Sequence, residues 1–306
     1  MEAANVTADW VALDWGTTNL RVWAMSSAGT IMAQAMSDNG MSKLSRDGYE
    51  PALLELIGGW LNGPVTAVAC GMVGSRQGWI EAPYARTPCS PTPADLVVAP
   101  TITPGLTVHI IPGIRQDNPP DVMRGEETQI AGFLALNPGW DGVLCLPGTH
   151  TKWVHVSAAE VISFQTVMTG ELFAMIGAQT VLRHTVGATG WDEPAFLTAL
   201  ADSIARPERL AGRLFSLRAE HLLHGLAPAT ARARLSGLLI GAELAATKPY
   251  WLGQQVAIIG AGTVSKLYQQ ALATQSAPAV LADGQSVTLA GLTAAYRRLK
   301  GAQDAP

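Results

Sequence analysis

The chain has little charge, few cysteines and no concentration of basic residues. Charged residues make up 14% of its 306 residues, and the formal net charge is −4. A nucleic-acid-binding protein normally carries a basic patch, so we expect no nucleic-acid partner. Three widely spaced cysteines (Cys70, Cys89 and Cys145) form no CxxC pair, and the six histidines are scattered. This pattern excludes a disulfide framework and predicts no structural zinc site.

Long hydrophobic runs are missing as well. No stretch approaches the roughly 20 apolar residues of a membrane-spanning helix. The N-terminus lacks the basic start and apolar core of a signal peptide. We therefore expect a cytoplasmic protein with no membrane partner. Hydrophobic residues still account for 48% of the chain, which excludes disorder, and its length suits two domains with a ligand site in the cleft between them.

The sequence contains one construction twice: an apolar strand, a Gly-Thr turn and a second strand. The first copy runs from Val11 to Trp23 around Gly16, and the second from Val143 to Val154 around Gly148. An ordinary hairpin has the same letters, so neither copy alone is specific. Together they predict a duplicated α/β domain whose turns face each other across a cleft suited to a nucleotide triphosphate.

Strand and helix patterns alternate in both halves of the chain. A three-stranded meander is predicted from Trp10 to Ala35. Further strands are predicted at 65–70, 107–111, 160–164, 256–259 and 279–281, and helices at 51–61, 121–134, 231–246, 264–273 and 287–299. Asn137-Pro138-Gly139 interrupts the pattern before the second hairpin, which predicts an N-terminal domain over 1–137 and a C-terminal domain over 138–306.

Backbone amides and short polar side chains in the two turns suit phosphate oxygens. The predicted phosphate contacts are Gly16, Thr17, Thr18 and Asn19 in the first turn and Gly148, Thr149 and Thr151 in the second. Asp14, at the end of the first strand, is placed for a Mg²⁺ ion, directly or through water. Lys152 adds a cation to the second turn, although a solvated strand-end lysine would look the same.

Gly260-Ala261-Gly262-Thr263 ends a strand and begins a helix. A nicotinamide fingerprint would have a third glycine, and Lys266 stands where that fingerprint needs a small residue for close helix packing. We interpret these four residues as an adenosine-binding turn, since glycines let a base and ribose lie against the backbone. A plain strand-to-helix turn is the alternative.

Phosphoryl transfer to a hydroxyl needs a carboxylate base. The candidates precede the second hairpin: Asp117, Asp121, Glu126 and Glu127. Gly125 lies inside the predicted helix, where a glycine costs about 1 kcal/mol relative to alanine. It therefore indicates close approach by another group. Glu171 could bind substrate hydroxyls, and one or two of four arginines would suit a substrate carboxylate: Arg21, Arg76, Arg115 and Arg124.

Six segments together resemble the 2-dehydro-3-deoxygalactonokinase family: 14–21, 69–75, 122–129, 147–153, 167–172 and 235–243. The family belongs to the superfamily of actin, hexokinase and the chaperone ATPases. The resemblance therefore implies an α/β fold with two ribonuclease-H-like domains that hold ATP in an interdomain active-site cleft. It also implies ATP- and Mg²⁺-dependent phosphorylation of a sugar acid, 2-dehydro-3-deoxy-D-galactonate, at its terminal hydroxyl in galactonate catabolism.

The resemblance also implies residue roles. Asp14 with 17–19 matches the first phosphate motif, 148–151 the second, and 260–263 the adenosine motif. The predicted substrate contacts are Gly71, Met72, Ser75, Arg76, Arg124 and Glu171. Related sugar kinases commonly carry an Asp base, after an Asn, where this sequence has Gly125-Glu126. We take Glu126 as the base, with Asp14 and Asp121 as alternatives.

Three rival functions stay open. The first is a kinase of the same fold acting on another sugar acid or an amino sugar. The second is a non-kinase member of the superfamily, either an ATPase-driven binding protein or a phosphatase. The third is a nicotinamide-dependent reductase that uses Gly260 and Gly262. The sequence does not fix the oligomeric state, and a homodimer is compatible with it.

Overall fold

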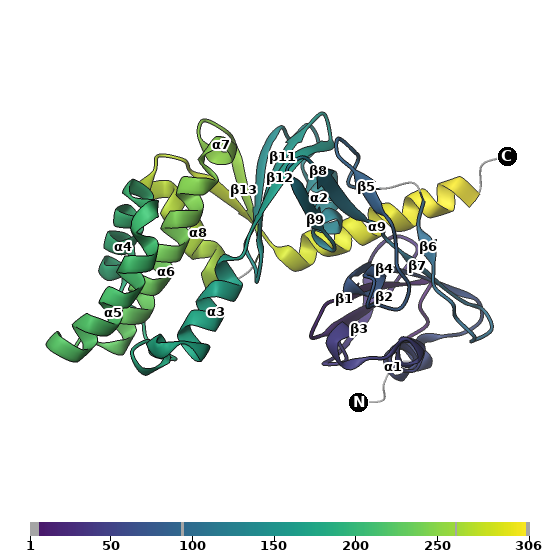
Figure 1. Ribbon diagram of the computed structural model, residues 1–306. Coiled ribbons are helices and arrows are strands. Elements are labelled where there is room, and N and C mark those ends of the chain that lie inside the picture. Colours follow the sequence, from purple (N-terminus) through teal and green to yellow (C-terminus); the bar gives the residue numbers. More distant parts are fainter. Residues whose placement is uncertain (1–5, 93–94, 261, 304–306) are drawn as a thin grey trace. The chain divides into compact units, whose positions relative to one another are not determined.

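The computed structural model describes residues 6–92, 95–260 and 262–303 (Figure 1). By its contacts the chain divides into two units. One unit combines 1–140 with 156–163 and 283–306, and the other combines 141–155 with 164–282. They differ from the predicted ranges 1–137 and 138–306 in placing a short hairpin segment and the C-terminal helix with the N-terminal part. That the units are two domains around a cleft stays a prediction.

The first unit is built on a six-stranded sheet in the order β3-β2-β1-β4-β7-β6. Its strands are β1 (Trp10–Trp15), β2 (Leu20–Met25), β3 (Ile31–Ser37), β4 (Val65–Gly71), β6 (Val97–Val98) and β7 (Leu106–Ile110), and its helices are α1 (Tyr49–Ile57), α2 (Glu126–Leu136) and α9 (Gly284–Gln303). The predicted meander is confirmed, because β2 is antiparallel to both β1 and β3. β1, β4 and β7 run parallel. Antiparallel strands 3-2-1 followed by two parallel strands make a ribonuclease-H-like sheet.

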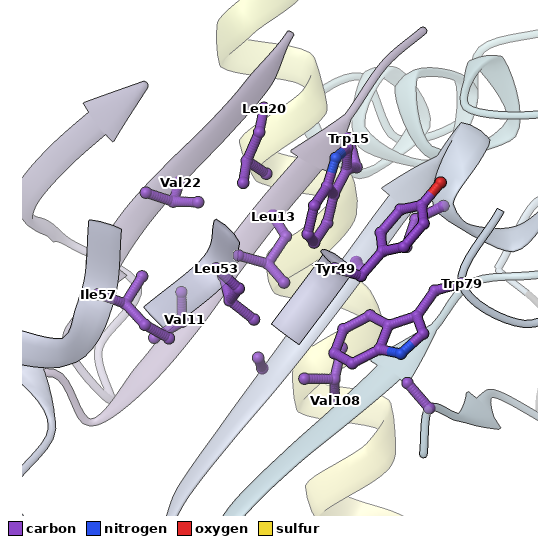
Figure 2. Close-up of a cluster of buried hydrophobic side chains, with 14 of the residues drawn as sticks. Val11, Leu13, Trp15, Leu20, Val22, Tyr49, Leu53, Ile57, Trp79 and Val108 are labelled. Atoms are coloured by element: carbon purple, nitrogen blue, oxygen red, sulfur yellow. The ribbon is translucent and has the colours of Figure 1, made fainter. Parts of the chain in front are cut away.

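Both faces of β1 are covered, which explains its almost continuous apolar run. Val11, Leu13 and Trp15 point into a core shared with α1, drawn in Figure 2. The alternate residues belong to a second cluster under α9, where Trp10 stacks on Tyr296 with ring centroids 4.3 Å apart. The strand thus has a fixed register, which carries its last polar residue to a defined place at the sheet edge.

The prediction of a helix beginning at Asp121 is wrong. A small separate sheet occupies this part of the chain, with β5 (Tyr84–Arg86), β8 (Gly113–Asp117) and β9 (Pro120–Met123) in the order β5-β8-β9. Asp121 pairs with Gln116 across β8 and β9. Cross-strand pairing within this proline-rich region outweighs the local helical spacing. Helix α2 begins only at Glu126.

Helices α2 and α9 pack with their backbones almost in contact. A Cβ on Gly132 would lie 1.7 Å from the Val287 carbonyl oxygen, and one on Gly291 would lie 1.9 Å from that of Thr128. No larger residue fits at either position. This close packing fixes the position of α2 and therefore of the acidic residues at its start.

The second unit repeats the order of the first five strands of the six-stranded sheet in a five-stranded sheet, β12-β11-β10-β13-β14. Its strands are β10 (Gly142–Leu146), β11 (Thr151–Ser157), β12 (Glu160–Val167), β13 (Val256–Ile259) and β14 (Ala279–Ala282). The tip of the β11–β12 hairpin, 156–163, belongs by its contacts to the first unit. β13 runs parallel to both β10 and β14. The duplication predicted from the two hairpins therefore extends over five strands.

Six helices of this unit are described: α3 (Thr169–Gln179), α4 (Glu193–Ala205), α5 (Leu210–His224), α6 (Pro228–Ala246), α7 (Lys248–Trp251) and α8 (Gly262–Thr274). α6 packs against both α4 and α5, and the three lie side by side (Figure 1). No helix in the described part of the chain is long and apolar enough to cross a bilayer.

Candidate functional site

The first Gly-Thr turn closes the hairpin between β1 and β2. The Gly16 N–H donates to the Asn19 carbonyl over 2.9 Å, and the Asn19 side-chain amide donates to the Thr18 hydroxyl over 3.0 Å. The side chains of Thr17, Thr18 and Asn19 are exposed. The turn therefore presents polar groups outward from the end of a buried strand.

The segment after β3 fixes this turn from behind. The N–H groups of Met41 and Ser42 donate to the carbonyls of Gly16 and Thr17, each over 3.0 Å. A Cβ on Gly40 would lie 2.4 Å from the Thr17 carbonyl oxygen. The Gly16 and Thr17 carbonyls of the first turn are thus hydrogen-bonded to the segment that follows β3.

The second turn has the same support. The Glu171 N–H donates to the Thr149 carbonyl over 2.9 Å, and a Cβ on Gly170 would lie 2.1 Å from the Gly148 carbonyl oxygen. Our sequence reasoning missed these backing glycines. The available signal was that each follows the third strand of its sheet, as each Gly-Thr turn follows the first.

Two predicted contacts of the second turn point inward. Thr151 is 1% exposed and its hydroxyl lies 2.9 Å from that of Tyr268. Lys152 is 5% exposed and its ammonium group donates to the Thr166 hydroxyl over 2.8 Å. The exposed part of the turn is therefore Gly148 to His150.

Glu171, predicted to contact substrate hydroxyls, pairs with a neighbouring side chain in the structure. Its carboxylate lies 2.6 Å from His150 Nε2, and both side chains are about half exposed. The pair sits where the second turn meets the start of α3. Any hydroxyl contact by Glu171 would share this carboxylate with His150.

A cavity of about 720 Å³ opens beside the second turn, entirely within the second unit. Pro147 and Gly148 line it from the turn, and 263–265 with Leu267 and Tyr268 line it from α8. The predicted adenosine turn leads directly into this wall, since Gly260 follows β13 and Gly262 is the first residue of α8. Ala261 falls outside the described residues.

The opposite walls of the cavity were not predicted. They comprise Thr169, Gly170 and Phe173 of α3, residues 188–191, and Arg232, Ser236, Leu239 and Ile240 of α6. The Arg232 guanidinium lies over the Phe173 ring, 5.1 Å from its centroid, and donates to the Gly187 carbonyl over 3.2 Å. The helical spacing in α6 could have indicated a continuous face, but not what that face borders.

Asp14 lies at the C-terminal end of β1, in register with Arg21 on β2 and Cys70 on β4. Its carboxylate forms an ion pair with Arg21. Burial raises the pKa of Asp14, although the Arg21 charge opposes the shift. Among the described residues, no group of three or more His, Cys, Asp or Glu side chains is placed to hold a metal ion.

The two glutamates at the start of α2 differ sharply. Glu127 is fully buried and accepts a hydrogen bond from the Gly125 N–H over 2.6 Å. Burial, together with the negative charge of Glu126, raises the pKa of Glu127 to about 8. Glu126 is partly exposed and accepts from the Arg124 N–H over 3.1 Å.

Gly125 is not inside the helix as predicted but just before it, with a φ of 104° that disfavours other residues. The inferred close approach is confirmed, since a Cβ on Gly125 would lie 3.3 Å from Cα of Gly71. Gly71 ends β4 and is followed by a 3₁₀ turn over Met72–Gly74. The start of α2 is thus held against the end of β4, and both belong to predicted substrate segments.

The arginines are distinguished by their partners. Arg76 pairs with Glu81, and Arg115 with Asp117. Arg124 instead donates through Nη2 to the Ala82 carbonyl over 2.7 Å, and its guanidinium stacks over Tyr84 at 4.3 Å. Two more of its nitrogens, Nε and Nη1, are buried without a hydrogen-bond partner among the described residues, as is the Ser75 hydroxyl.

Two sheets of the same strand order, each with a Gly-Thr turn between its first two strands, define an ATPase fold of the actin and hexokinase type, to which sugar kinases belong. Within this class, the chain belongs to the 2-keto-3-deoxy-galactonokinase family, whose model matches residues 14–295. It is a carbohydrate kinase.

The relatives agree with this assignment. The chain is 38% identical over 303 residues to a protein of Rhizobium meliloti (strain 1021) assigned as 2-dehydro-3-deoxygalactonokinase DgoK1, covering 95% of this chain and 97% of the relative. It is 33% identical over 291 residues to the 2-dehydro-3-deoxygalactonokinase of Escherichia coli (strain K12), covering 94% and 97%. A crystal structure from Sinorhizobium meliloti assigned to the same activity superposes with a TM-score of 0.84 at 37% identity, covering 94% and 96%.

Proposed function

We propose that the protein transfers the terminal phosphoryl group of ATP to the terminal hydroxyl of 2-dehydro-3-deoxy-D-galactonate, giving the 6-phosphate, as a step of galactonate catabolism. The observation that carries the proposal is the cavity of about 720 Å³ beside the second Gly-Thr turn. Its size is within the range of small-molecule sites. It joins a turn suited to phosphates to the turn predicted for adenosine.

In this proposal the nucleotide occupies that cavity. The exposed backbone amides of Gly148 and Thr149 contact phosphate oxygens, and Gly260 to Thr263 lie along the adenosine. Thr151 and Lys152 support the second turn from inside the protein, because their side chains are buried. The first turn, with Gly16 to Asn19, supplies the other phosphate contacts.

Asp14 is the residue we assign to Mg²⁺, and a single strand-end carboxylate fits an ion that keeps several waters and phosphate ligands. A bound Mg²⁺ would neutralise charge on the phosphate oxygens. Arg21, paired with Asp14, fixes the direction of the carboxylate. No other residue is required for the ion by this proposal.

Glu126 is the proposed base. It is partly exposed at the start of α2, whereas the pKa of Glu127 is raised to about 8, which keeps that fully buried carboxyl protonated at neutral pH. Asp14 is engaged by Arg21, and Asp121 lies on β9. In this role Glu126 accepts the proton of the attacking hydroxyl.

Glu126→Gln tests the base. Loss of the proton acceptor should lower kcat on the order of 100-fold or more while the affinity for ATP changes little. Asp121→Asn serves as the matched variant. Near-normal turnover in Glu126→Gln, with a loss in Asp121→Asn, would reassign the base to Asp121.

The sugar acid is proposed to lie against Gly71, Met72 and Ser75, with Arg76 and Arg124 near its carboxylate and Glu171 near its hydroxyls. Arg124 is the stronger candidate of the two arginines. Its guanidinium is held in place by Ala82 and Tyr84 and retains two donors without a partner among the described residues, whereas Arg76 is 78% exposed and pairs with Glu81.

A panel of sugar acids and amino sugars with coupled ADP detection tests the substrate. Highest kcat/KM for 2-dehydro-3-deoxy-D-galactonate supports the proposal, and a preference for another member of the panel overturns it. A cytoplasmic location and a homodimeric assembly stay predictions of the sequence.

A further inference from the structure

Glu243 is a buried carboxylate to which none of the roles above is assigned. It lies on α6 and is 2% exposed. It accepts hydrogen bonds from Trp153 Nε1 and the Tyr268 hydroxyl, both over 2.7 Å, and from the Thr169 hydroxyl. Burying a carboxylate is costly unless it is well hydrogen-bonded. The three donors offset that cost for Glu243.

The partners of Glu243 belong to the walls around the proposed nucleotide site. Thr169 and Tyr268 line the cavity. Trp153 and Thr151 lie on β11 immediately after the second Gly-Thr turn, and the Thr151 hydroxyl is 2.9 Å from that of Tyr268. Three other elements, β11, α3 and α8, therefore meet at one carboxyl group on α6.

The contact with α3 bears directly on the shape of the turn. Thr169 is the first residue of α3, and the next residue, Gly170, leaves no room for a Cβ against Gly148. Glu171 then donates its N–H to Thr149. By accepting a hydrogen bond from Thr169, Glu243 fixes the first residue of α3. The next two residues of α3 support the second Gly-Thr turn.

A carboxylate is better suited here than a neutral amide. The Trp153 indole can only donate, and the second carboxylate oxygen accepts from both Thr169 and Tyr268. Burial raises the pKa of Glu243, while the hydrogen bonds from Thr169, Tyr268, Trp153 and Thr151 oppose that shift. A glutamine would offer one accepting oxygen and turn an NH₂ group toward one of these donors.

We propose that Glu243 is a positioning residue for nucleotide binding, holding the second Gly-Thr turn, the start of α3 and the α8 wall of the cavity in their mutual arrangement. The inference rests on the proposed function, because it takes the cavity as the nucleotide site. A residue that served folding alone would affect stability but leave the affinity for nucleotide in the folded protein unchanged.

Glu243→Gln and Trp153→Phe test the proposal, with Leu244→Ala as control. Trp153→Phe removes one hydrogen-bond donor to Glu243. Trp153 is not among the described residues that line the cavity. Leu244 is the neighbour of Glu243 on α6, is fully buried and is not among the described lining residues. The dissociation constants of ADP and of a non-hydrolysable ATP analogue are measured with Mg²⁺ by calorimetry on the full chain, alongside Tm and the two KM values.

Glu243→Gln should weaken ADP binding at least about tenfold, which is a change of 1.4 kcal/mol, and raise the KM for ATP in parallel. The KM for the sugar acid should stay within about twofold. Trp153→Phe should shift ADP affinity in the same direction by less. Leu244→Ala should lower Tm and leave ADP affinity unchanged.

Wild-type ADP affinity in folded Glu243→Gln would overturn the inference, as would an equal loss in Leu244→Ala at a matched drop in Tm. Should Glu243→Gln fail to fold, Thr169→Val and Tyr268→Phe each remove one donor to Glu243 at similar side-chain volume. Unchanged ADP affinity in both of these variants would also overturn the inference. If the wild-type protein binds neither nucleotide, the proposed function itself fails, an outcome distinct from a failure of Glu243.

Discussion

Gly170→Ala should damage nucleotide use without touching a reacting group. Its added methyl carbon would lie 2.1 Å from the Gly148 carbonyl oxygen and 3.0 Å from Cα of Thr149. Non-bonded atoms prefer separations near 3.5 Å or more, so the turn or the start of α3 must move by about 1 Å. Overpacking of this kind costs about 1 to 3 kcal/mol of stability.

A displacement of about 1 Å at a catalytic arrangement costs on the order of 100-fold in rate. We therefore expect kcat/KM for ATP to fall by about that factor, measured by coupled ADP release at saturating sugar acid, with a lowered Tm. Gly177→Ala is the matched control on the same helix. There a Cβ meets nothing closer than Val186 at 3.9 Å, so higher helix propensity should raise Tm slightly and leave the kinetics unchanged.

The reasoning would be refuted by a folded Gly170→Ala protein with wild-type kcat and KM for ATP. It would be equally refuted if Gly177→Ala lost activity to the same extent, since the effect would then belong to helix α3 in general rather than to its contact with the turn. Circular dichroism and Tm establish that each variant is folded before its kinetics are compared.

Three further perturbations address the first unit. Asp14→Asn should lower kcat at least about 100-fold, because the proposed Mg²⁺ ligand is lost; unchanged Mg²⁺ dependence of the rate would contradict this role. Arg124→Lys should raise the KM for the sugar acid about tenfold and leave that for ATP unchanged, because lysine cannot replace the planar fork; Arg86→Lys, at an exposed ion pair with Asp117, is the control, and an equal effect there would count against Arg124. Glu127→Gln should change how stability depends on pH. Because the pKa of Glu127 is raised to about 8 in the folded protein, its contribution to stability is fully present below its ordinary pKa and is lost as pH rises to about 8. Denaturant unfolding at pH 5.5 and 8 should therefore show the wild type losing stability relative to Glu127→Gln by up to about 1.4 kcal/mol per pH unit, and an equal difference at both pH values would disprove it.

Sequence patterns predicted the parts of this fold that depend on local order. The apolar run before Gly260 ends in the structure where β13 ends, and both Gly-Thr hairpins form as expected. The apolar run of β1 predicted a strand because its two faces are both buried, each in a different core. Such signals are carried by neighbouring residues in the chain and need no knowledge of tertiary structure.

Other features depend on contacts between distant segments. Asp121 lies in a strand because β8 pairs with it, and the helical spacing that begins at Asp121 gave no sign of that pairing. Thr151 and Lys152 looked like surface residues of a turn, but β11 begins at Thr151 and buries both. Trp191 lines a cavity although nothing near it in the sequence resembles a binding motif. Spacing along the chain does not reveal such neighbours.

The support behind the two Gly-Thr turns has a consequence for the thermodynamics of anion recognition. Because the conformation of each turn is fixed on folding, its backbone amides lose little conformational entropy when an anion binds. Fixed dipoles can then contribute their full attraction. Gly40 and Gly170 would thus appear among inactivating positions in a saturation mutagenesis experiment, although neither presents a side chain to any ligand.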